Sequence, residues 1–165
     1  MKKTASLFVC CCISLYSYAQ INTDSLQKVW RDISKPDTVR LTAIDELAWN
    51  TRYKNPGSAT AYATLELNLA KEINHKFWQA KACNTLGVSC YIKSDYPKAI
   101  EWHQQSLAFM KEMRETGGMA TSYNNLGNIY SDQGDFVKAL QHYQRALDLV
   151  ESTNKPKASI YYGNI

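Results

Sequence analysis

Apolar side chains recur along this chain at helical spacing in several separate stretches. Near the N-terminus, Leu26, Val29, Trp30 and Ile33 follow at i, i+3, i+4 and i+7, which is typical of one face of a short amphipathic helix. A second helix is expected after Asp37, with that residue as its N-cap and Val39 and Leu41 on its apolar face. Similar stripes predict helices over residues 56–74, 76–92, 96–114, 119–131 and 135–152.

Part of this pattern occurs twice, 40 residues apart and without a gap. Residues 84–113 match residues 124–153 at eight identical positions: Asn84/Asn124, Leu86/Leu126, Gly87/Gly127, Asp95/Asp135, Lys98/Lys138, Ala99/Ala139, Gln104/Gln144 and Leu107/Leu147. A fixed period of this length indicates stacked units, none of which buries its apolar face alone. A weaker copy precedes them with its first helix one residue out of step, because Leu47 lies 39 residues before Leu86.

Helix-breaking residues separate the expected helices. Asn55-Pro56 and Asp95 with Pro97 have the form of helix N-termini, with a capping side chain followed by proline in the first turn. Gln133-Gly134-Asp135 is expected to be the turn inside one hairpin, and Thr116-Gly117-Gly118 the separator between two hairpins. Gly87 and Gly127 lie inside helices, where we expect them to permit close approach of the partner helix.

Residues 1–19 form a separate piece with the layout of a secretory signal peptide. Lys2 and Lys3 precede an apolar run from Ala5 to Tyr16, and small residues precede an expected cut after Ala19. The alternative is a membrane anchor, although the run is shorter than the roughly 20 residues that a spanning helix needs. The sequence therefore predicts an exported, periplasmic or otherwise extracytoplasmic protein, with a short helix and linker over residues 20–36.

Charge and cysteine content narrow the classes further. Without residues 1–19 the chain has 17 basic and 15 acidic residues, or a net charge of +2, which gives no electrostatic case for nucleic acid. Cys83 and Cys90 are seven residues apart on one expected helix, about 10 Å along its axis, and are therefore expected to be free thiols. Because phosphate loops, nucleophile elbows and Cys-x-x-Cys pairs are absent from the sequence, we expect no enzyme activity, no cofactor and no metal. His103 is expected to be a hydrogen-bonded, partly buried ring.

The repeats resemble tetratricopeptide repeats, whose pattern is W-x2-L-G-x2-Y followed by A-x3-F and then A. Residues 123–146 match it with Tyr123, Leu126, Gly127, Tyr130, Ala139, Tyr143 and Ala146. The preceding unit matches with Cys83, Leu86, Gly87, Cys90, Ala99, His103 and Ser106. The late proline of the family is absent, and the spacing is 39–40 residues where the family has 34, so the second helices are expected to be longer.

This resemblance implies an all-α fold, a right-handed α-solenoid of antiparallel helical hairpins. The units would cover about residues 37–75, 76–114 and 115–154, followed by a partial repeat over 155–165. In the family, a peptide usually lies in the concave groove lined by the first helix of each unit. The groove positions carried over to this chain include Trp49, Arg52, Lys81, Asn84, Tyr91, Asn124 and Asn128.

Two alternatives stay open at these positions. The asparagines could bind a peptide backbone through their amides, or they could tie neighbouring helices together. Trp49 could anchor a partner or pack beneath the N-terminal helix, and packing is the favoured interpretation. A clamp for a C-terminal carboxylate is not expected, since Asp45 and Glu46 occur where basic or amide groups would be needed.

The function expected from this resemblance is non-catalytic binding of a protein or peptide. No nucleic-acid partner and no small-molecule substrate are inferred. The layout of a signal peptide followed by long repeats is also similar to the sensory N-terminal regions of some bacterial signalling proteins. The alternative function is therefore the sensory part of a longer membrane-bound histidine kinase or transcriptional regulator, with membrane contact only through a segment beyond residue 165.

Overall fold

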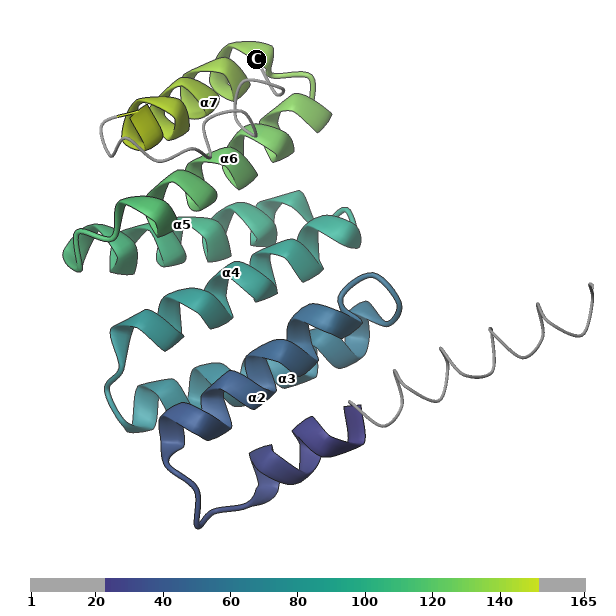
Figure 1. The fold of residues 1–165 in the computed structure, drawn as a ribbon. Coiled ribbons are helices and arrows are strands. Elements are labelled where there is room, and N and C mark those ends of the chain that lie inside the picture. The colour runs from purple at the N-terminus through teal and green to yellow at the C-terminus, as the bar shows by residue number, and fades with distance from the viewer. Residues whose placement is uncertain (1–22, 152–165) are drawn as a thin grey trace, which may run out of the picture.

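The structure is a computed structural model that describes residues 23–151. Within this range every regular element is a helix, and the helices stack in chain order as antiparallel hairpins, as the series from purple to yellow in Figure 1 shows. The N-terminal helix (residues 23–31) is followed by α2 (Asp37–Thr51), α3 (Pro56–Glu72), α4 (Lys76–Ile92), α5 (Tyr96–Glu112), α6 (Thr116–Asp132) and α7 (Phe136–Glu151). The predicted all-α solenoid is confirmed. The predicted signal peptide and the partial repeat at 155–165 lie outside the described residues.

Four successive connections reverse the chain in the same way. The residue before the last one of each connection has a positive φ, at Asn74 (52°), Ser94 (58°), Arg114 (55°) and Gly134 (78°), which are 20 residues apart. The next N–H in each case bonds the carbonyl five residues back, as from Asp95 to Cys90 at 2.9 Å. This is the Schellman arrangement, which satisfies carbonyls at the end of a helix. The 40-residue period therefore consists of two equal halves, each a helix plus three connecting residues.

One of these connections allows a direct test of backbone strain. Arg114 is exposed and left-handed, a conformation that costs a residue with a Cβ about 1 kcal/mol or more relative to glycine. We expect Arg114→Gly to raise the free energy of unfolding by about 0.5–1 kcal/mol, measured by urea denaturation. Arg114→Ala is the matched control and should give no such gain. Equal stabilities for the two variants would contradict the assigned geometry.

The glycines inside the hairpins permit close packing, as predicted. A Cβ at Gly127 would lie 2.5 Å from the ring of Tyr143, and a Cβ at Gly87 would lie 2.7 Å from the imidazole of His103. These rings come from the second helix of the same hairpin, so α4 packs against α5 and α6 against α7 at their closest point. Burial follows the same 40-residue repeat. Residues 101–110 and 141–150 have the same order of buried, half-buried and exposed side chains.

Two expectations about helix starts are wrong. Thr116-Gly117-Gly118 does not separate hairpins, because it forms the first turn of α6. Gly118 is required there for packing, since a Cβ would lie 2.3 Å from the Met110 sulfur. Asp37 is the first residue of α2 and not its cap, and its carboxylate pairs with Arg40 at 2.8 Å. By contrast, Asn55 and Asp95 accept backbone N–H bonds at helix starts as expected. Asp135, expected to be the first residue of the last helix, lies one residue before α7 and accepts a bond from the Lys138 N–H.

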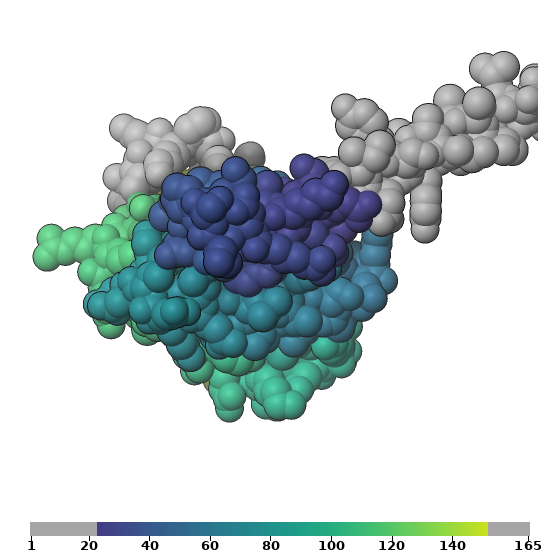
Figure 2. Space-filling view, turned by 90° about the horizontal axis from the view of Figure 1, so that it is seen from below, coloured from purple at the N-terminus to yellow at the C-terminus, as the bar shows by residue number. Residues whose placement is uncertain are grey.

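The N-terminal helix covers the outer side of the first hairpin, and its purple atoms face the viewer in Figure 2. Leu26 and Trp30 pack against the core that includes Leu41 and Ile44 of α2. The helix ends at residue 31, so the predicted stripe does not include Ile33, which is 85% exposed in the following turn. Val39, expected on the apolar face of α2, is also exposed. A short cap of this kind shields the first unit from solvent.

Candidate functional site

The first helices of the three hairpins, α2, α4 and α6, form a row with direct contacts between α2 and α4 and between α4 and α6. Along this row lies a cavity of about 700 Å³. Its lining comes from these three helices and from the ends of α5 and α7, and includes Asp45, Glu46, Trp49, Phe77, Lys81, Asn84, Glu115 and Thr121. We call this cavity the groove. Two of its aromatic side chains face solvent, with Trp49 43% and Phe77 39% exposed.

Three of the seven predicted site residues line the groove: Trp49, Lys81 and Asn84. The prediction that Trp49 packs beneath the N-terminal helix is wrong, because Trp49 lines the groove and is half-exposed, while Leu26 and Trp30 of that helix pack against the core around Leu41. Trp49 is instead held by Arg52, whose guanidinium lies 3.6 Å from the indole centroid and also bonds the Trp49 carbonyl. Arg52 is therefore a support for Trp49 and not part of the lining.

Four charged side chains line the groove, and only two of them form a salt bridge with each other. Lys81 forms an ion pair of 2.5 Å with Asp45, which joins α4 to α2 across the first two units. Glu46 and Glu115 line the same groove and have no salt bridge among the described residues. The lining therefore contains three carboxylates and one lysine, and that lysine is already paired. This distribution agrees with the expectation that the groove is no carboxylate clamp.

Two of the three asparagines predicted to face the groove, Asn84 and Asn128, bond to other side chains of the protein. The Asn84 side-chain oxygen accepts a 2.9 Å bond from the Asn125 amide, which links α4 to α6. Asn128 accepts a 2.9 Å bond from the Tyr143 hydroxyl, and Tyr91 donates to Asp132 at 2.6 Å. The alternative in which asparagines join neighbouring helices thus holds for the oxygens of Asn84 and Asn128. Asn124 lies half-buried on α6, outside the lining of the groove.

A buried carboxyl behind the groove was not expected from the sequence. Glu66 on α3 is 0% exposed, and neither of its oxygens has a hydrogen-bond partner. Burial, with a further contribution from the nearby charge of Asp45, raises the pKa of Glu66 to about 9, while Lys81 acts in the opposite direction. Glu66 is therefore protonated at neutral pH. The sequence does contain a signal for this burial, because the equivalent positions of the next two repeats hold the small residues Ser106 and Ala146.

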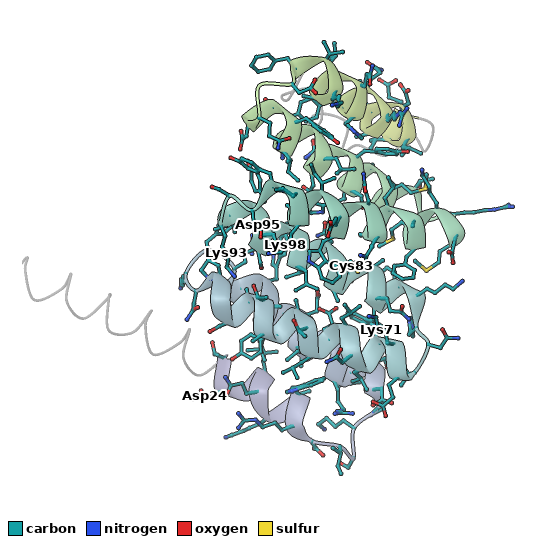
Figure 3. All side chains as sticks on the ribbon, turned by 180° about the vertical axis from the view of Figure 1, so that it is seen from behind. Asp24, Lys71, Cys83, Lys93, Asp95 and Lys98 are labelled. Atoms are coloured by element: carbon teal, nitrogen blue, oxygen red, sulfur yellow. The ribbon has the colours of Figure 1, made fainter. Side chains whose placement is uncertain are left out.

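Two other titratable side chains lie in the core. His103 was expected to be partly buried and hydrogen-bonded, but it is 1% exposed and its Nδ1 has no partner. Burial lowers its pKa to about 4, so the ring is neutral at physiological pH. Cys83 is a buried free thiol inside the stack, as Figure 3 shows, and burial raises its pKa to about 11. Over residues 23–151 no group of three His, Cys, Asp or Glu side chains is placed to hold a metal ion.

Comparison with known proteins decides the family. The tetratricopeptide repeat model matches residues 78–152 and again residues 118–165, which together are more than half of the chain. The chain is a tetratricopeptide repeat protein. Its repeats are thereby placed in a family of protein-interaction modules. The expectation that the second helices carry the extra length of each unit is wrong, because first and second helices have nearly the same length: α4, α5 and α6 each have 17 residues and α7 has 16.

Curated relatives share part of their length with this repeat chain. Protein FLUORESCENT IN BLUE LIGHT, a chloroplastic protein of Arabidopsis thaliana, is 28% identical over 101 residues, 61% of this chain and 32% of its own length. Protein HGV2 of Halocynthia roretzi is 32% identical over 96 residues, and tetratricopeptide repeat protein 29 of Trypanosoma brucei is 28% identical over 95 residues. The matches cover 52% and 57% of this chain, and the chain spans only 19% of each of these two relatives.

Solved structures show the same arrangement. The repeat domain of the Arabidopsis FLU protein superposes with a TM-score of 0.64 at 25% identity, over 71% of this chain and 99% of that domain. BtubC of P. vanneervenii superposes with a TM-score of 0.74 at 17% identity, over 92% of this chain and 63% of that one, which shows the fold alone. In the described part of the tetratricopeptide repeat array, no helix has the length and apolar character needed to cross a bilayer.

Proposed function

We propose that this repeat protein binds an extended peptide segment of a partner protein in the groove along α2, α4 and α6. The observation that carries the proposal is the groove itself, a cavity of about 700 Å³ lined by the first helices of three successive units. Its size lies within the range of ligand pockets, 300–1,000 Å³. Its open, elongated lining suits a chain that runs across several repeats.

The chemistry of the lining supports a peptide as the ligand. Trp49 and Phe77 are partly exposed and give apolar surface of the kind that anchors partner side chains. The Asn84 amide uses its oxygen for Asn125, while its nitrogen carries two donors suited to backbone carbonyls. The Lys81–Asp45 pair and the bond from Asn125 to Asn84 hold the three helices together before any ligand arrives. A preformed groove loses less entropy on binding than a flexible one.

Peptide selection tests this proposal. A random dodecapeptide library displayed on phage is selected against the chain, and the affinities of selected peptides are measured by fluorescence anisotropy. Trp49→Ala and Phe77→Ala are each expected to weaken binding about tenfold or more, because an aromatic anchor contributes 1–2 kcal/mol or more. Phe136→Ala is the matched control, since Phe136 is a 70% exposed aromatic side chain on α7 outside the groove. Peptides that tolerate both groove variants would refute the groove as the binding site.

We also propose that the protein is exported, with cleavage after Ala19. The support is the Lys2-Lys3 start, the apolar run that follows it and the small residues at 17 and 19. Expression of the full chain in a Gram-negative host, followed by mass spectrometry of the periplasmic fraction, should give a mature N-terminus at Gln20. Ala19→Arg should block processing, whereas an intact N-terminus in the cytoplasm of cells making the unaltered chain would contradict export.

A further inference from the structure

We infer that the groove is selective for a basic segment, an extended peptide whose lysine or arginine side chains lie among Asp45, Glu46 and Glu115. This inference rests on the proposed function and names the class of partner. It follows from the charge of the lining together with the apolar surface beside it.

The lining of the groove carries more acidic than basic side chains. Asp45, Glu46 and Glu115 line the groove, and Lys81 is its single basic lining residue. Lys81 already forms a 2.5 Å salt bridge with Asp45, which joins α4 to α2 and neutralises its charge. Glu46 and Glu115 are exposed, and no lysine or arginine in residues 23–151 forms a salt bridge with them. A peptide with basic side chains supplies the missing counter-charges, and complementary charge is what selects partners and speeds their association.

Aromatic surface lies beside these carboxylates in the groove. Trp49 and Phe77 line the same groove and are 43% and 39% exposed. Lysine and arginine side chains cover apolar surface with their methylene stems while their charged ends reach polar groups. An aromatic ring also attracts a cation that lies over its face. Arg52 stacked on Trp49 at 3.6 Å is an instance of this contact within the protein.

Acidic peptides fit the same groove poorly. A carboxylate would enter beside Glu46 and Glu115 and would have to compete with Asp45 for Lys81. The groove lining therefore disfavours an acidic peptide.

The same displayed dodecapeptide library tests the inference. Selected peptides are expected to be enriched in lysine and arginine, and their affinity should fall as salt is raised from about 0.05 M to about 0.5 M. The double variant Glu46→Gln/Glu115→Gln should weaken them about tenfold or more and reduce this salt dependence. Glu72→Gln/Glu101→Gln makes the same charge change at exposed positions outside the groove and should leave binding unchanged.

The outcomes separate this inference from the proposed function. Neutral or acidic peptides that lose affinity with Trp49→Ala but not with Glu46→Gln/Glu115→Gln would overturn the preference for basic segments and leave the groove as the binding site. Peptides insensitive to Trp49→Ala and Phe77→Ala would overturn both. Equal weakening by the groove pair and by the Glu72/Glu101 pair would also overturn the inference, since it would reflect only the net charge of the protein.

Discussion

Replacing Glu66 by glutamine should stabilise the fold by about 3 kcal/mol at pH 7. The carboxyl is fully buried with no partner for either oxygen, and burial raises its pKa from 4.5 to about 9. At pH 7 the unfolded chain ionises this group while the folded chain keeps it protonated, so ionisation favours unfolding. Glutamine has nearly the same shape and does not ionise, so this term disappears in the variant.

The sign of this effect fixes its pH dependence. Because the folded protein holds a proton that the unfolded chain releases, the Glu66 contribution is fully present below about pH 4.5 and is lost as pH rises toward 9. The advantage of Glu66→Gln should therefore be near zero at pH 4 and grow steadily up to pH 9. Urea denaturation at a series of pH values measures it. Glu101→Gln, at an exposed position of α5, is the control and should show no such trend. A variant that is less stable than the native chain at pH 7 would show that Glu66 is ionised and paired.

His103 gives a slope of the opposite sign over a lower range of pH. Burial lowers the pKa of His103 from 6.5 to about 4. Between pH 4 and pH 6.5 the imidazole is therefore protonated in the unfolded chain and neutral in the folded chain. The stability lost to His103 thus grows as pH falls below 6.5. Between about pH 4.5 and 6.5 the contributions of Glu66 and His103 cancel, and the native protein should be most stable there.

Gly127→Ala should lower the free energy of unfolding by about 2–3 kcal/mol. The added methyl would lie 2.5 Å from the ring of Tyr143, a distance that real Cβ atoms do not reach. Tyr143 is buried and its hydroxyl is bonded to Asn128, so the ring has little freedom to move away. The variant must separate α6 from α7, and the separation removes contacts from the core of the third hairpin.

Gly117→Ala is the matched control for this substitution. Gly117 is exposed in the first turn of α6, and the nearest atom to an added Cβ is a flexible Glu115 oxygen at 3.4 Å. Alanine is a better helix former than glycine by up to about 1 kcal/mol, so this variant should be unchanged or slightly more stable. Thermal melting followed by circular dichroism compares the two. Similar melting temperatures for Gly117→Ala and Gly127→Ala would contradict the close approach of α6 and α7.

The stacking of hairpins was predictable because local and repeating signals agree. Apolar stripes and capping residues place most helix ends within a few residues, and the match of residues 84–113 with 124–153 shows that the units stack. The failures come from contacts that local reading does not contain. Gly117-Gly118 has the composition of a break, yet it lies in the first turn of α6. Gly118 is there for packing, because Met110 occupies the space that a side chain would need.

The site was predictable in position and less so in detail. Family positions located Trp49, Lys81 and Asn84 in the groove, since helix phase determines which side chains face it. Whether an amide binds a ligand or a neighbouring helix depends on side chains 41 residues away, as in the bond from Asn125 to Asn84. The burial of Glu66 depends on how α2, α3 and α4 pack together. A repeat comparison would have marked it as a large charged residue among small ones.

The central claim is that a partner peptide lies along α2, α4 and α6. Paramagnetic relaxation measures this directly, with a spin label attached to a selected dodecapeptide and the amide resonances of the isotopically labelled chain assigned. The expected result is strong broadening of resonances from residues around Trp49, Lys81 and Thr121, with those at the outer surface of α3 and α7 unaffected. Broadening centred on Phe136 and Leu140 of α7, with the groove unaffected, would contradict it.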